Sequence, residues 1–270
     1  MKIIKSASVI LVGFILVTIT LVSGCLPFDI DTPSRETITG SSVVTDYLLD
    51  YSGFSELTVA GPIRTEITRA SIYKVSLSVN ENVLHYVQIN QIVNVLRINL
   101  DPSVNYRNVD IVLTIGLPDL RTLGISAAGT CTLNGFNLEE DMEISVSGAS
   151  TLKMQNINTE YASLAATGAS NIIGDLISEE ARVSVSGAST INLSGQCIHM
   201  FIEVSGASQL KMSDFWVNKA NVIASGVSGV DINVGGSLDI TLSGVSSMTY
   251  GGNPKLGTVR VDALSTLRRR

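Results

Sequence analysis

Apolar and polar residues alternate with a period of two along most of the chain after residue 42, which is the pattern of β-strands. In residues 43–120 the alternation comes in short runs, such as Leu57 to Val59 and Ile111 to Ile115, separated by turn residues such as Gly61. No helical period fits these positions, and Ser, Thr, Val and Gly at this density form helices poorly. The pattern predicts an all-β protein.

Beyond residue 120 the alternation is organised by a repeat of the motif Ser-Gly-Ala-Ser. Each copy centres on a glycine, and the last copy has alanine there: Gly129, Gly148, Gly168, Gly187, Gly206, Gly226, Gly244 and Ala263. Successive copies are 19, 20, 19, 19, 20, 18 and 19 residues apart. So constant a period predicts stacked units, each one coil of a parallel β-solenoid whose strands pair with their counterparts one coil on.

Aligned copies form columns that run along the solenoid. The positions two before and four after the glycine are apolar and are predicted to face the core. Polar positions lie one before and three after it, and they are the candidate outward binding face: Ser147, Thr167, Ser186, Ser205, Ser225 and Ser243, with Thr151, Asn171 and Thr190. The glycine itself is expected at a corner, where φ is positive or a side chain would clash.

A further column, two residues after the glycine, should also face inward as a small polar row with hydrogen bonds to neighbouring hydroxyls or backbone. Its members are Cys131, Ser150, Ser170, Ser189, Ser208, Ser228, Ser246 and Ser265. Cys131 is therefore predicted to be a buried small residue. Cys197 lies in another column, three coils away, so a disulfide between the two is not expected.

The first residues read as a targeting segment. Residues 1–24 combine Lys2 and Lys5 with an apolar run over residues 8–22, which is the composition of a signal peptide. The residues just before Cys25 resemble a bacterial lipobox, and that resemblance implies cleavage before Cys25 and lipidation of its sulfur. An uncleaved membrane helix is the alternative, because the run approaches the roughly 20 residues that span a bilayer. Both readings tether the chain outside the cytoplasm.

Three further segments are expected after the signal peptide. Residues 25–42 are polar, contain prolines and fit a flexible, lipidated linker. Residues 43–120 are predicted to be N-terminal coils or a β-cap, since a solenoid end should not be left as an open apolar edge. Residues 121–270 are the regular part, in which Arg268, Arg269 and Arg270 would protect the far end.

Charge and titratable residues argue against several function classes. The formal net charge of −6 becomes −8 once the two lysines of residues 1–24 are removed, so a nucleic-acid partner is not expected. The two histidines, His85 in a predicted strand and His199 in a predicted loop, lie 114 positions apart. Neither fits a zinc site or a Ser/His/Asp triad. No catalytic residue, metal or cofactor is therefore predicted.

The carboxylates are scattered over different columns, whereas β-helix enzymes that act on polysaccharides need them clustered. Asp231 is expected one coil above Lys211, in a surface ion pair. Two acidic groups are placed in loops between repeats, and calcium binding at the first of them is disfavoured: Glu139, Glu140 and Asp141, and then Glu179 and Glu180.

Four stretches together resemble a known bacterial family, the auto-transporter adhesin head domain, also called the GIN domain. They are FSELTVAG at residues 54–61, ENVLHYVQINQIVNVLRINL at 81–100, IVLTIGLPDLRTLGIS at 111–126 and the Ser-Gly-Ala-Ser copies. The resemblance covers about residues 46–267. It implies a right-handed parallel β-helix related in shape to pectin lyases, a cell-surface setting and a role in adhesion. It supplies no catalytic residues.

The resulting hypothesis is a lipid-anchored, cell-surface adhesion or binding module without catalysis, whose hydroxyl-rich face contacts polysaccharide or a protein partner. One alternative is a structural or assembly protein of the envelope, including a homo-oligomer. The other is a carbohydrate-active enzyme on the same fold, which would need carboxylates that meet on one face.

Overall fold

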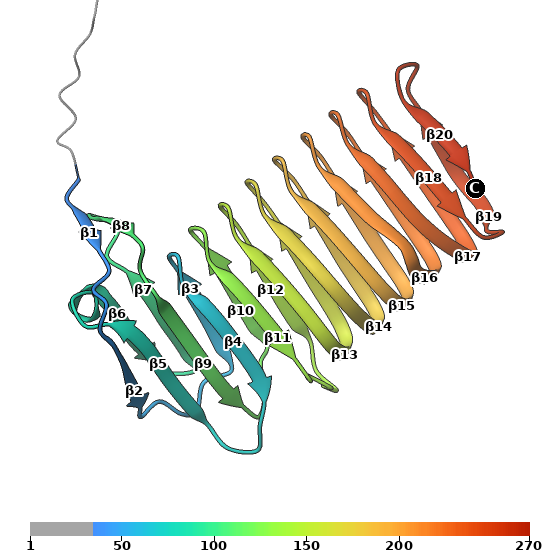
Figure 1. The fold of residues 1–270 in the computed structure, drawn as a ribbon. Coiled ribbons are helices and arrows are strands. Elements are labelled where there is room, and N and C mark those ends of the chain that lie inside the picture. Colours follow the sequence, from blue (N-terminus) through green and yellow to red (C-terminus); the bar gives the residue numbers. More distant parts are fainter. Residues whose placement is uncertain (1–34) are drawn as a thin grey trace, which may run out of the picture. The chain divides into compact units, whose positions relative to one another are not determined.

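The computed structural model describes residues 35–270, and within them the chain is built of β-strands with one turn of 3-10 helix at Leu84–Tyr86 (Figure 1). The first strands are β1 (Thr37–Thr39), β2 (Val44–Leu49), β3 (Glu56–Ala60), β4 (Arg64–Arg69), β5 (Lys74–Asn80), β6 (Val87–Ile92), β7 (Val95–Leu100), β8 (Asn105–Arg107) and β9 (Ile111–Leu117). The remaining strands are β10 (Thr122–Ser126), β11 (Thr130–Asn134), β12 (Met142–Val146), β13 (Thr151–Ala166), β14 (Asn171–Val185), β15 (Thr190–Val204), β16 (Gln209–Ala224), β17 (Gly229–Leu242), β18 (Ser247–Gly251), β19 (Lys255–Val261) and β20 (Thr266–Arg269). The predicted all-β solenoid with parallel stacking is confirmed.

Each regular coil consists of one long strand whose two halves lie in two opposed sheets. The first half of β13 pairs with β11, and its second half pairs with β12, both in parallel. We call the sheet that contains β4, β9, β11, the first halves of β13–β17, β18 and β20 the leading sheet. The trailing sheet contains β3, β7, β10, β12, the second halves and β19. The apolar core lies between the two sheets.

The N-terminal strands stack in an order that differs from their order in the chain. Strand β3 pairs with β7 on one side and β10 on the other, and β4 likewise lies between β9 and β11. Beyond them the pairing becomes antiparallel, β5 with β9, β2 with β5, and β6 with β7. Residues 43–120 thus contain both parallel coils and antiparallel strands that end the stack.

Part of the expected flexible linker is a strand. Residues Thr37–Thr39 form β1 and pair in parallel with Asn105–Arg107 of β8. This strand forms because the backbone of the alternating Thr-Ile-Thr segment pairs with the edge of β8 and the side chain of Ile38 packs on the core. Residues 1–34, with the predicted signal peptide and Cys25, lie outside the described residues.

The glycines of the repeat occupy a sharp corner between the two sheets, as predicted. Gly148, Gly168, Gly187, Gly206, Gly226 and Gly244 have φ between 71° and 77°. A Cβ on Gly187 would lie 2.5 Å from the carbonyl oxygen of Gly168 one coil earlier, and the three later glycines are similarly crowded. Left-handed φ and a stacked backbone therefore both exclude a side chain here.

The first copy of the repeat is shifted by two residues from its predicted alignment. Thr130 pairs with Thr151 and Cys131 with Leu152, so that Ala127, with φ of 59°, takes the corner position. Gly129 consequently takes the place of a serine, and Cys131 lies in the apolar column. The alignment on Gly129 is wrong because the backbone ladder sets the register, and the small Ala127 can adopt the left-handed conformation that the corner needs.

The serine column faces the core, as predicted, and Ser150, Ser170, Ser189, Ser208, Ser228 and Ser246 are all at most 2% exposed. Some hydroxyls have partners: Ser170 Oγ donates to the carbonyl of Val146 (3.0 Å) and lies 3.3 Å from Ser189 Oγ. The hydroxyls of Ser208 and Ser228 have no hydrogen-bond partner among the described residues. The expected row of hydrogen bonds is thus only partly present.

Cys131 and Cys197 are free and buried, which confirms that they do not form a disulfide. Burial raises the pKa of both thiols. The thiol of Cys197 also donates to the carbonyl of His199 at 3.0 Å. Both cysteines are structural residues of the core.

We expect Gly187→Val to lower the unfolding free energy of residues 35–270 by about 2 kcal/mol or more, because the left-handed conformation alone costs an L-residue roughly 1–2 kcal/mol. The clash with the backbone of Gly168 adds to this cost. Urea denaturation followed by circular dichroism measures the change. Ala188→Ser, on the same exposed corner, is the control and should unfold at the wild-type midpoint; equal midpoints for both variants would contradict the role of the corner.

The two buried thiols should react with Ellman's reagent only after unfolding, because the reactive thiolate is suppressed by burial. We expect negligible release of chromophore from folded residues 35–270 and two equivalents in denaturant, since this segment contains Cys131 and Cys197. The half-exposed Ser147→Cys variant is the positive control and should react in the folded state. Rapid native-state reaction of the wild type would show that the core is open.

Candidate functional site

The predicted hydroxyl columns lie on both sides of the glycine corner, not on one face. Ser147, Thr167, Ser186, Ser205, Ser225 and Ser243 follow the ends of trailing-sheet strands, and all are at least partly exposed. Thr151, Asn171 and Thr190 pair in register at the start of β13, β14 and β15, in the leading sheet. Each set forms a straight row, and the exposed corner separates the two rows.

Two other outward rows on the trailing sheet border a hollow that the sequence reasoning missed. In register along the solenoid, one row is Tyr161, Glu180, His199, Lys219 and Ser237, and the other is Ser163, Arg182, Phe201, Asn221 and Asp239. All of these except Ser163 line a hollow of about 450 Å³. We call this hollow the lateral groove.

Three buried core residues lie beneath the groove. Ala181, Met200 and Ala220 are 4–5% exposed and lie between the two rows in the strand direction. Their column continues with Met142 and Ala162 on one side and Leu238 on the other. These side chains have inward parity and pack in the core, so the floor of the groove is the strand backbone between the two outward rows.

Charged and polar side chains lie beside aromatic rings on the walls of the groove. The guanidinium carbon of Arg182 lies 4.6 Å from the centre of the Phe201 ring, and its Nη2 lies 3.6 Å from Glu203 Oε2. His199 Nδ1 lies 3.6 Å from Glu180 Oε1, one coil away. The Phe201 and Tyr161 side chains are half-buried. The groove therefore offers ring faces together with charged and amide groups, held on a rigid sheet.

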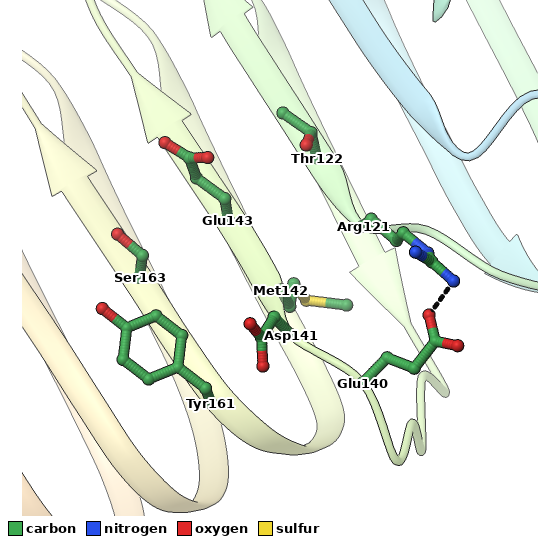
Figure 2. Close-up of a pocket in the computed structure, with 8 residues that line it drawn as sticks. All are labelled: Arg121, Thr122, Glu140, Asp141, Met142, Glu143, Tyr161 and Ser163. Carbon is green, nitrogen blue, oxygen red and sulfur yellow. Dashed lines mark ion pairs between the residues drawn. The ribbon is translucent and has the colours of Figure 1, made fainter. Parts of the chain in front are cut away.

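A second hollow, of about 560 Å³, continues from Tyr161 toward the N-terminal coils. Figure 2 shows Arg121 and Glu140 joined by an ion pair at one side of it, with Asp141, Glu143 and Tyr161 along the strands beside it. Glu140 belongs to the acidic loop considered above as a calcium site, and it forms an ion pair with Arg121. Within residues 35–270, no three His, Cys, Asp or Glu side chains converge as metal ligands would.

Several predicted positions need correction. His85 lies in the 3-10 turn, and His199, together with Glu179 and Glu180, lies in a strand. His85 is thus outside the strand predicted for it. His199, Glu179 and Glu180 are not in the predicted loops, because the long strands β14 and β15 continue through the bend between the sheets. Asp231 pairs in register with Lys211, as predicted.

The ion pair of Asp231 is nevertheless made with a different partner. Its Oδ1 lies 2.7 Å from Arg270 Nη2. Arg270 reaches it across Gly251, whose missing side chain leaves the path open.

The lateral groove could have been found only by extending the column analysis away from the motif. Tyr161 and His199 stand seven residues before a corner glycine, and Arg182 and Phe201 stand five before one. Both positions have outward parity. The repeated motif identifies only the corner, because the residues there are the most similar from coil to coil.

A family model matches residues 53–254, and its description is "putative auto-transporter adhesin, head GIN domain". The chain belongs to this family. The predicted resemblance is confirmed. No curated protein matches the chain.

Solved structures share the fold of this GIN domain at low sequence identity. A "putative adhesin" from Parabacteroides merdae has a TM-score of 0.80 at 16% identity, over 87% of this chain and 99% of the other. A "putative lipid binding protein" from Parabacteroides distasonis has a TM-score of 0.79 at 16% identity, over 87% and 100% of the two chains. A "putative adhesin" from Bacteroides fragilis has a TM-score of 0.66 at 16% identity, over 86% and 100%.

The family description bears on where the GIN domain is found. The family description is that of a surface adhesin, which favours a location outside the cytoplasm. Among residues 35–270, no helix is long and apolar enough to cross a bilayer.

Proposed function

We propose that this chain is a lipid-anchored, cell-surface adhesion module that contacts polysaccharide through its trailing sheet, without catalysis. The lateral groove carries this proposal, because it combines two half-buried aromatic rings with charged and amide side chains on straight, rigid rows. Ligand sites typically pair apolar ring faces with a few fixed polar groups. The apolar faces of sugar rings fit the former, and their hydroxyls fit the latter.

The predicted hydroxyl column extends the same surface. Ser186 and Ser205 lie four residues after Arg182 and Phe201 on the same trailing-sheet strands or at their ends. A linear polymer lying across the coils would meet the groove rows and the serine row together. Many weak, water-exchanged contacts of this kind suit adhesion better than tight binding of a small molecule.

The structure favours a binding role over glycoside hydrolysis. Hydrolysis generally requires two carboxyl groups about 5 to 9.5 Å apart on either side of the scissile bond. Two carboxylates line the lateral groove. Glu180 Oε1 lies 3.6 Å from His199 Nδ1, and Asp239 Oδ1 accepts a hydrogen bond from the backbone N–H of Thr258, so both are already engaged within the domain. We therefore place recognition, and not chemistry, at this surface.

The anchoring part of the proposal rests on Cys25 and the lipobox-like residues before it. A single lipid chain binds membranes only marginally, whereas several acyl groups on one residue hold a protein stably. Residues between Cys25 and β1 would then separate the solenoid from the bilayer.

Binding should be visible as retardation of residues 35–270 in native gels cast with envelope polysaccharides. We expect Phe201→Ala to weaken the interaction about 3- to 10-fold, the loss expected for one aromatic contact. Trp216→Ala is the matched control, because Trp216 is an exposed aromatic residue that does not line the groove. Unchanged mobility in every gel would refute polysaccharide binding, and clearing of the gel would refute the absence of catalysis.

Lipidation should depend on Cys25. In bacteria fed labelled palmitate, the full chain should carry label and sediment with membranes, and Cys25→Ser should lose the label. The Cys131→Ser variant should keep it, since Cys131 is buried in the core. A Cys25→Ser chain that stays in the membrane at full length would instead support the uncleaved membrane helix.

A further inference from the structure

The last coil exposes the cross-section of the core. Leu256, Val259 and Val261 of β19 are 39–42% exposed. Their register partners one coil earlier, Leu238, Ile240 and Leu242, are at most 1% exposed. The same inward column is therefore sealed within the solenoid and open at this end, which we call the C-terminal end.

The backbone at the C-terminal end is also unpaired on its outer side. Within the described residues, β19 pairs only with β17, and β20 only with β18. Figure 1 shows both strands at the red end of the stack, with no strand beyond them. Two edge strands with free N–H and C=O groups, one in each sheet, are a template for further strand pairing.

The opposite end, the N-terminal end, offers edges at the matching positions. There β6 pairs only with β7 of the trailing sheet, and β2 only with β5, which continues the leading sheet. The inward side chains of these two strands are incompletely buried, namely Tyr47, Leu49, Val87 and Ile89. Each sheet thus has one free edge at each end.

The two ends carry opposite charge. Residues 255–270 contain five basic residues and one acid, Asp262, whereas residues 35–54 contain three acids, Glu36, Asp46 and Asp50, and one base, Arg35. Arg260 and Arg268 are exposed and form no ion pair within residues 35–270. The excess at the C-terminal end is therefore not neutralised by the chain itself.

We infer that the C-terminal end of one copy binds the N-terminal end of a second copy, head to tail. Strand β20 would gain β2 of the second copy as a parallel neighbour. A bend at the joint would bring β6 against β19 as an antiparallel neighbour, because the leading sheet has one strand more than the trailing sheet. This arrangement continues both sheets, covers the exposed apolar column and brings basic residues onto acidic ones. A tail-to-tail pair would instead place two basic ends together, which like-charge repulsion opposes.

A head-to-tail contact leaves one free end on each side, so association is open-ended. It does not depend on the lateral groove or on polysaccharide binding, because the groove lies on the side of the solenoid. Failure of one proposal therefore leaves the other standing.

Sedimentation velocity of residues 35–270, which form one compact unit, tests the inference. We expect the weight-average mass to at least double with rising protein concentration at low salt, and to fall as salt is added. Reversing the acidic end with Asp46→Lys and Asp50→Lys should leave a monomer. Glu160→Lys with Glu179→Lys is the matched control, because it makes the same charge change in the middle of the solenoid and should associate like the wild type.

Mixing two charge-reversal variants distinguishes the head-to-tail contact from tail-to-tail pairing. The C-terminal variant Arg260→Glu with Arg268→Glu should also be monomeric alone, and it should co-assemble when mixed with the Asp46→Lys, Asp50→Lys variant. Association of the latter variant alone would indicate tail-to-tail pairing and overturn the inference. A wild-type segment that stays monomeric at all concentrations would overturn it as well.

Discussion

Successive coils stack closely at the glycine corner, where there is no space for a Cβ. The carbonyl oxygen of Gly168 would lie 2.5 Å from a Cβ on Gly187, and the same crowding recurs up to Gly244. Because every corner stacks directly on the previous one, the strands that leave it start in register in both sheets. The inward and outward parity of each later position follows from that register. Core, serine column and outward rows all depend on this one contact.

Fixed register turns the outer surface into a grid of side chains. Residues from different coils, such as Arg182 and Phe201, are neighbours because the backbone places them one strand apart. The lateral groove is then bounded by the two outward rows that lie on either side of the inward column of Ala181, Met200 and Ala220. A rigid grid loses little conformational entropy when a ligand binds, which helps weak contacts to add up.

The sequence was sufficient to predict the features that the repeat controls. The solenoid, the corner glycines and the inward serines follow from period and parity, and each is present. The alignment failed at Ala127, where an alanine performs the role of glycine, and it failed for His199, where a strand runs through a bend that looks like a loop. The position of β3 between β7 and β10 could not be predicted, because local alternation does not specify which strands pair. The groove was missed since its residues differ from coil to coil.

The sides and the ends of the solenoid pose different physical problems. The sides carry mainly polar outward rows, whereas the last coil of the described residues has an exposed apolar column and a backbone edge that an added strand pair would cover. Head-to-tail joining of copies would solve this problem and would also repeat the lateral groove along one axis. A polymer held at several grooves binds with an effective concentration set by their spacing, so that weak single contacts become strong attachment. Self-association and surface adhesion would then reinforce one another, although each can be measured without the other.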